Sequence, residues 1–226
     1  MSAVMSYSLN KDNARKVGES TAITEKGAYV GFFTRAEALT SKKGTQGIEF
    51  DFKSNDGAVA KYMTVWTIGA DGNDLSGRQL VDAVLASMGV LKITAADAMV
   101  KKWNNETRKD EDVRATVFPE LMNRAVGVVL QREEYETQAG ERKWKNALVC
   151  PFVAETRCTA GERLDKKPAV ALDRILERLT DRPLKATAQR AAYGGTNYAR
   201  PAPSQSSTGG AQPSSGFDDM SDDIPF

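Results

Sequence analysis

The chain contains 226 residues, of which 41% are apolar and 27% are charged, as in an ordinary globular protein. Histidine is absent and Cys150 and Cys158 have no further ligands beside them, so we expect no metal, no cofactor and no catalytic residue. No apolar run is long enough to cross a bilayer and no signal-peptide pattern is present, so we expect a reduced, cytoplasmic protein without a membrane partner.

The charges are distributed unevenly along the chain. The whole chain carries 31 basic and 30 acidic side chains, a net charge of +1. Residues 201–226 hold four of the aspartates and no Lys or Arg, so residues 1–200 carry 31 basic side chains against 26 acidic ones. A basic body joined to an acidic tail suits a protein that binds a polyanion.

Regular patterns begin at Gly27, after a polar N-terminal arm over residues 1–26. Residues 29–39 are rich in β-forming side chains and predict a curved strand in which Gly31 permits a bend. Residues 41–45 then predict a turn that carries two lysines.

Two more strands are predicted before the first helix. Ile48, Phe50 and Phe52 alternate with polar residues, which is the clearest period-two pattern in the chain. After a turn at residues 54–57, a third strand is predicted over residues 59–68. Both faces of this third strand are apolar, so one face meets the core and the other is either a second core contact or a surface for stacking.

A helix is predicted over residues 77–88, with Ser76 as its N-cap. Residues 94–97 resemble a capping box and predict a second short helix through Trp103, followed by a solvated loop over residues 104–114.

Strands resume at residues 124–132 and 143–150, which a polar loop joins as a hairpin. The resulting order β-β-β-α-β-β predicts a mainly β protein, a five-stranded OB-fold barrel with a helical insertion between strands 3 and 4. A further amphipathic helix is predicted after Pro168 and ends before Pro183. The barrel and this helix form a predicted domain over residues 27–183, followed by a disordered linker over residues 184–216.

The acidic tail, residues 217–226, ends in Asp222-Asp223-Ile224-Pro225-Phe226. With the Gly/Pro/Gln/Ser-rich segment before it, this ending resembles the tail of bacterial single-stranded DNA-binding proteins. Gly27-Ala28-Tyr29 and residues 40–50 are similar to phage-encoded DNA-binding proteins of OB-fold type. The resemblance implies a non-catalytic protein of phage replication, recombination and repair that works in the cytoplasm of a bacterial host. It also implies a tail that recruits a polymerase, helicase, primase, nuclease or recombinase through Asp218, Asp219, Asp222, Asp223, Ile224, Pro225 and Phe226.

Single-stranded DNA is held by aromatic rings that stack on bases and by Lys and Arg that follow the phosphates. Three places in the sequence interleave such residues, and Trp144 between two lysines is the strongest candidate. Trp103 is assigned instead to helix or core packing. The predicted DNA-binding residues are Phe33, Arg35, Lys42, Lys43, Lys61, Tyr62, Trp66, Arg132, Tyr135, Lys143, Trp144 and Lys145.

Two alternatives remain open at this point. Glu49, Asp51 and Asp56 could serve a metal-dependent nuclease, although the alternation around Phe50 already explains the first two as the solvent side of a strand. The barrel could also be an adaptor that binds only protein. The sequence does not determine the oligomeric state, and a homo-oligomer is compatible with it.

Overall fold

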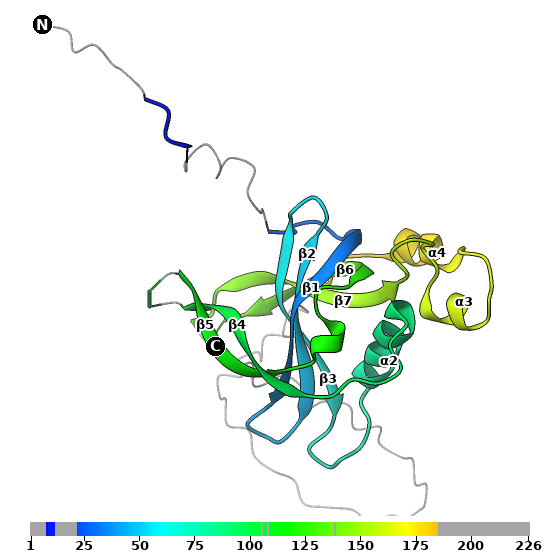
Figure 1. Ribbon diagram of the computed structural model, residues 1–226, viewed down its shortest axis with the longest axis horizontal. Helices are drawn as coiled ribbons and strands as arrows, with labels where there is room; N and C mark the ends of the chain where they lie inside the picture. The colour runs from blue at the N-terminus through cyan, green and yellow to red at the C-terminus, as the bar shows by residue number, and fades with distance from the viewer. Residues whose placement is uncertain (1–7, 12–21, 105, 108, 138, 185–226) are drawn as a thin grey trace, which may run out of the picture. The chain divides into compact units, whose positions relative to one another are not determined.

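The computed structural model describes residues 8–11, 22–104, 106–107, 109–137 and 139–184. The predicted tail, nearly all of the linker and most of the N-terminal arm therefore lie outside the described residues. Within them, seven strands form one antiparallel sheet with few helices (Figure 1). The strands are β1 (Gly27–Thr40), β2 (Gln46–Ser54), β3 (Val59–Ile68), β4 (Ala96–Asn104), β5 (Lys109–Val117), β6 (Ala125–Glu136) and β7 (Arg142–Phe152). The helices are α2 (Ser76–Met88), η1 (Pro119–Leu121), α3 (Ala160–Leu164) and α4 (Ala171–Arg178).

Strand β1 is the centre of the sheet because it changes partner along its length. Its first part pairs with β6, from Gly27 opposite Leu130 to Phe32 opposite Ala125, and its later part pairs with β2. At Gly31 both ladders meet, and a Cβ atom there would lie 2.1 Å from the carbonyl oxygen of Lys53. Glycine is therefore required where β2 approaches the bend in β1, as the sequence predicted.

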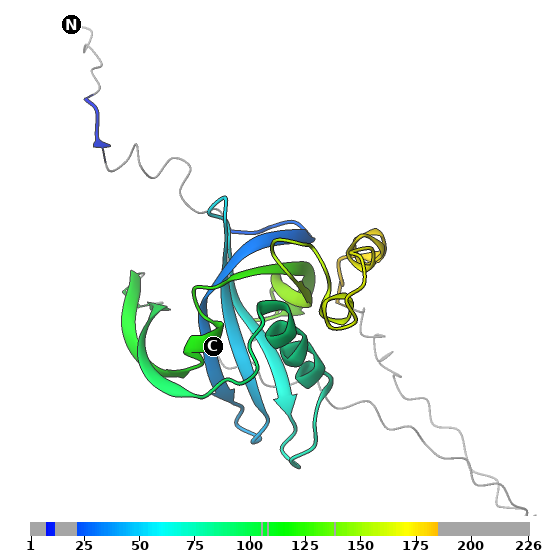
Figure 2. The ribbon, with the colours of Figure 1, turned by 45° about the vertical axis from the view of Figure 1, so that its right-hand side comes forward.

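The main core lies between the inner face of β1, β2 and β3, the strand β6 and the helix α2. Figure 2 shows α2 on one side of β1, β2 and β3, and the β4–β5 hairpin on the other side. Phe33, Phe50 and Phe52 from the sheet are almost completely buried, as are Val84 from α2 and Val128 from β6. The alternating residues of β2 thus face the core, which confirms that part of the prediction.

Strand β3 pairs only with β2, and β7 pairs only with β6, so β3 and β7 are not joined by a ladder among the described residues. The segment before β1 bridges them instead. The amide of Ile23 donates to the carbonyl oxygen of Val59 at 2.8 Å, and the Asn146 side chain donates to the carbonyl oxygen of Ile23 at 2.9 Å. Ile23 is buried between the two strands. The mainly β prediction is confirmed, whereas closure of an OB-fold barrel is not shown.

The region from residue 94 to residue 114 differs from the prediction. The expected helix is strand β4, and the expected solvated loop contains most of β5. Ala98, Val100 and Lys102 face inward and alternate with exposed residues, and Val100 packs on Ala115 and Val117. No capping box forms, because the backbone amide of Thr94 donates to Glu120. We call this hairpin, residues 96–117, the arm.

The helix predicted over residues 77–88 is confirmed as α2, but its N-cap is Leu75 and not Ser76. The helix predicted after Pro168 is confirmed as α4. Helix α3 was not predicted, although Thr159 and Glu162 form a capping box at its start.

Candidate nucleic-acid interface

The β6–β7 hairpin extends beyond the part of β6 that pairs with β1. The ladder between β1 and β6 ends at Gly27 and Leu130, and from Gln131 onward β6 continues with β7. We call residues 131–147 the distal hairpin. Because side chains alternate along a strand, Arg132 and Trp144 lie on one of its faces, and Tyr135, Lys143 and Lys145 lie on the other. The sequence treated these residues as one cluster, and the structure divides them between two faces.

Trp144 is the best exposed ring of the distal hairpin. Its side chain is 42% exposed, and it belongs to none of the buried apolar clusters of the described residues. The guanidinium carbon of Arg132 lies 4.7 Å from the centre of the indole ring, which is cation–π geometry. The site therefore combines a cation with an accessible aromatic surface, as base stacking and phosphate binding require.

On the opposite face of the distal hairpin, both lysines have partners within the protein. The ammonium of Lys145 lies 6.0 Å from the ring centre of Tyr135, which is half-buried. Lys143 pairs with Glu141 at 3.0 Å, and the hydrogen bond and charge of that carboxylate raise the pKa of Lys143. Part of the positive charge predicted here is therefore already compensated within the protein.

Residues 181–184, which we call the strap, run parallel to β6. They lie beside the part of β6 after Leu130, where β6 no longer pairs with β1. The amide of Arg182 donates to the carbonyl oxygen of Arg132, and the amide of Glu134 donates to that of Arg182, each at 2.8 Å. This pairing places Asp181 beside the guanidinium of Arg132 at 3.2 Å. The cation that stacks on Trp144 is thus held and partly neutralised by a carboxylate of the strap.

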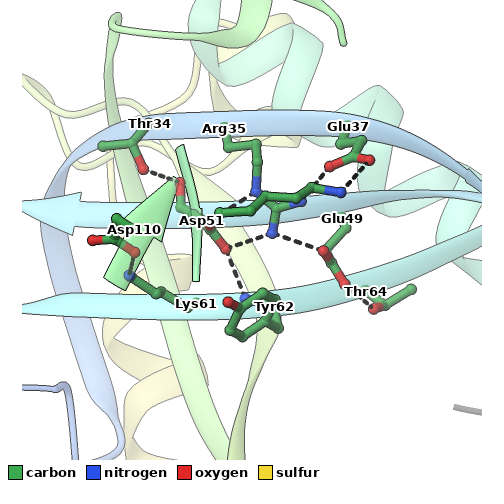
Figure 3. Close-up of polar contacts among 10 residues, drawn as sticks. Thr34, Arg35, Glu37, Glu49, Asp51, Lys61, Tyr62, Thr64 and Asp110 are labelled. Atoms are coloured by element: carbon green, nitrogen blue, oxygen red, sulfur yellow. Dashed lines mark hydrogen bonds and ion pairs between the residues drawn. The ribbon is translucent and has the colours of Figure 1, made fainter. Parts of the chain in front are cut away.

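Tyr62 lies on a bulge of β3. Phe50 is opposite Met63, whereas Phe52 is opposite Ala60, so Lys61 and Tyr62 together oppose Asp51. Tyr62 has φ 60°, a conformation that non-glycine residues rarely adopt. Its amide donates to the Asp51 carboxylate at 2.7 Å, and its ring is 45% exposed (Figure 3). The bulge directs an aromatic ring out of the sheet and holds it there.

Arg35 lies under Tyr62 and is only 2% exposed. Its guanidinium donates to Asp51 at 2.9 Å, to Glu49 at 2.7 Å and to Glu37, and Lys102 of the arm donates to Glu37 at 2.7 Å (Figure 3). Burial lowers the pKa of Arg35, but the hydrogen bonds and charges of Asp51 and Glu49 outweigh burial and raise it above its ordinary value. We call these five side chains the Arg35 cluster.

The Arg35 cluster corrects two predictions. Arg35 cannot reach a phosphate, and Phe33 is fully buried in the core, so neither residue is available to DNA. Glu49 and Asp51 do not face solvent as predicted, because the arm covers their side of the sheet. The cluster contains three carboxylates and two cations, a net charge of −1, so the middle of this face repels phosphate.

Trp103 is 46% exposed on β4, so its assignment to helix or core packing is wrong. Asp110 lies directly across from it on β5 and pairs with Lys61 of β3 at 3.3 Å. The end of the arm therefore contacts the bulge that carries Tyr62. A period-two reading of Ala98, Val100 and Lys102 was the signal in the sequence that could have placed Trp103 on a strand.

The remaining predicted residues lie apart from these rings. Trp66 is half-buried, and a Cβ atom on Gly47 would lie 2.8 Å from its ring, so the indole packs against that glycine. Lys42 and Lys43 are exposed in the turn between β1 and β2. That turn lies at the Gln46–Ile68 end of the β2–β3 ladder, far from Lys61, so the structure does not bring these two lysines to the site.

A series of contacts connects the distal hairpin to the arm. Asn146, on the same face as Trp144, bonds to Ile23, which in turn bonds to Val59 at the start of β3. Lys61 follows on β3 and pairs with Asp110 beside Trp103. The strands that carry Trp144, Tyr62 and Trp103 are thus connected to one another through these contacts.

No protein-family model and no curated protein matches this chain.

The carboxylates named for a nuclease are engaged within the protein. Glu49 and Asp51 bind Arg35, and Asp56 accepts a hydrogen bond from Ser54. Within the described residues, no three His, Cys, Asp or Glu side chains are grouped so that they could hold a metal ion. Over the same part of the chain, none of the helices has the length and apolar character needed to cross a membrane.

Proposed function

We propose that the protein binds single-stranded DNA without catalysis, along a path marked by Trp144, Tyr62 and Trp103. The observation that carries this proposal is the exposure of these three rings, which lies between 42% and 46% on three different strands. Large aromatic side chains are normally buried, and an exposed ring on a strand or bulge is a ready platform for a base. Arg132 and Lys61 lie beside this path and can contact phosphates.

The same geometry favours single strands over duplex DNA. A base can stack on a protein ring only if its own face is free, and in a duplex both faces are covered by neighbouring base pairs. The acidic Arg35 cluster further favours a path along the edge of the sheet over one across its middle. The proposed DNA path passes the bulge at Tyr62, where Arg35 and Asp51 of the cluster lie beneath the ring, and leaves Glu37 and Glu49 to one side.

A gel-shift assay with oligo-dT and a duplex of equal length, in the presence of Mg²⁺, tests the proposal. We expect binding to the single strand, weaker binding to the duplex and no cleavage of either. Absence of binding would favour the protein-only adaptor, and strand scission would favour the nuclease. Either result would overturn the proposal.

The role of the tail in recruiting replication, recombination or repair enzymes rests on its resemblance alone. Deletion of residues 217–226 should leave the affinity for oligo-dT unchanged or raise it, because an acidic competitor is removed. Pull-down of host proteins with full-length and truncated protein should show partners that depend on the tail. A large loss of DNA affinity on truncation would contradict this division of roles.

A further inference from the structure

The outer edge of the arm is a strand edge that pairs with no other described strand and carries exposed apolar side chains. β4 has nine residues and pairs only with β5 among the described strands. Met99 is 63% exposed and Trp103 is 46% exposed on its outward face. An edge of this kind presents unpaired backbone donors and acceptors to another strand.

We propose that this edge pairs with the same edge of a second copy, in an antiparallel register centred on Met99. When a two-fold axis relates two antiparallel strands, the numbers of any two residues that face each other add up to the same total, which is twice the number of the central residue. In the register centred on Met99, Asp97 of one copy lies opposite Lys101 of the other, and this pair forms twice. Ala98 lies opposite Val100 on the inward face.

The neighbouring registers are less favourable. Centring the pair on Lys101 would place two lysines opposite each other, which is destabilising. Centring it on Val100 would place Asp97 opposite Trp103 and Met99 opposite Lys101, so that no opposite charges meet. The register centred on Met99 is therefore the one that charge complementarity selects.

The charges on β5 support the same register. Lys101 already faces Asp112 across the arm at 3.7 Å, and Asp97 faces Arg114 at 2.9 Å. Pairing two arms would join these into one row in which Asp112 and Lys101 of one copy are followed by Asp97 and Arg114 of the other. The signs alternate along the row, and the four-stranded sheet would carry one Trp103 from each copy.

The test uses two single variants of the full chain, Lys101→Asp and Asp97→Lys. Each homodimer would contain two like-charged pairs, so we expect each variant alone to dimerise at least about tenfold more weakly than the natural chain. An equimolar mixture restores opposite charges at both positions, because the two acidic side chains of one variant then face the two basic side chains of the other. We expect the mixture to dimerise within about threefold of the natural chain.

Sedimentation velocity over a wide range of protein concentration measures these association constants. Any distortion of the arm by a substitution is present in the mixture as well as in the single variants, so recovery in the mixture isolates the contact between copies. Lys166→Asp, an exposed site away from the arm, is the matched control and should dimerise normally. A natural chain that stays monomeric would overturn the proposal and would identify Lys101 as a charge that protects the edge. Undiminished dimerisation of the variants, or no recovery in the mixture, would overturn it as well.

Discussion

Replacing Trp144 with alanine removes one ring of the proposed DNA path and little else. The ring is 42% exposed, and the guanidinium of Arg132 lies against it at 4.7 Å. Stacking on an aromatic side chain contributes about 1–3 kcal/mol per base, so the dissociation constant for oligo-dT should rise about 5- to 150-fold. The cation–π contact contributes only about 0.5–1 kcal/mol at an exposed site, so the thermal midpoint should change little.

Fluorescence anisotropy of a labelled oligo-dT at fixed salt measures this effect without relying on tryptophan emission. Trp144→Phe is the matched control, since it keeps a ring that can stack and should lose less affinity than the alanine variant. Circular dichroism and the melting midpoint verify the fold of both. If Trp144→Ala bound oligo-dT as tightly as the natural chain, the distal hairpin would have to be removed from the DNA path.

Three other substitutions test the ion pair of Arg132, the buried Arg35 cluster and the carboxylate of Glu162. Asp181→Asn removes the ion pair between Asp181 and Arg132, which is worth about 0.2–1 kcal/mol. The affinity for oligo-dT in the anisotropy assay should therefore rise by up to about fivefold. A fall in affinity would show that Asp181 positions Arg132 for DNA. Arg35→Met leaves Asp51 and Glu49 without their cation and Glu37 with Lys102 alone. It should lower the free energy of unfolding in urea by about 3–5 kcal/mol, whereas a loss under about 1 kcal/mol would indicate that solvent reaches the cluster. The amides of Val170, Thr159 and Ala171 lower the pKa of Glu162 from 4.5 to about 2, so its stabilising effect is present above about pH 4.5 and is lost as pH falls toward 2. Glu162→Gln should therefore lower the melting midpoint at pH 7 and flatten its fall in acid, and an unchanged acid profile would contradict this role.

Sequence patterns predicted the strands and helices whose core-facing residues repeat at the regular spacing of a strand or a helix. The observed bounds of β3 match the predicted ones, and α2 lies where a helix was predicted. Met63 and Val65 of β3 face the same core as Val81 and Val84 of α2. The arm was not recognised in this way, because the period-two pattern of Ala98, Val100 and Lys102 competes with a helical one. Met99 and Trp103 are four residues apart and fit a helical face as well as a strand, and only pairing with β5 decides between them.

The site shows a second limit of the same kind. Alternation around Phe50 correctly separated the two faces of β2, but it could not reveal that Lys102, from far along the chain, covers the polar face. Arg35 was therefore taken for a surface cation, although it is buried among carboxylates. Trp144 was predicted from the sequence because two lysines flank it, and Tyr62 because it follows Lys61 on a strand with two apolar faces. The strap at Asp181 gave no local signal, since its partner on β6 is 49 residues away.

The bridge at Ile23 is a weak connection between β3 and β7. The β1–β2, β2–β3, β1–β6, β4–β5 and β6–β7 pairs are ladders of several residues, and β1 meets β5 at one residue pair. In contrast, β3 and β7 are connected through the backbone of Ile23, which bonds to Val59 and Asn146. A pulling force applied to the chain on the N-terminal side of Ile23 would act on these hydrogen bonds first and break them one after another. Anchoring the protein by its N-terminus in a single-molecule experiment would thus load the connection between β3 and β7.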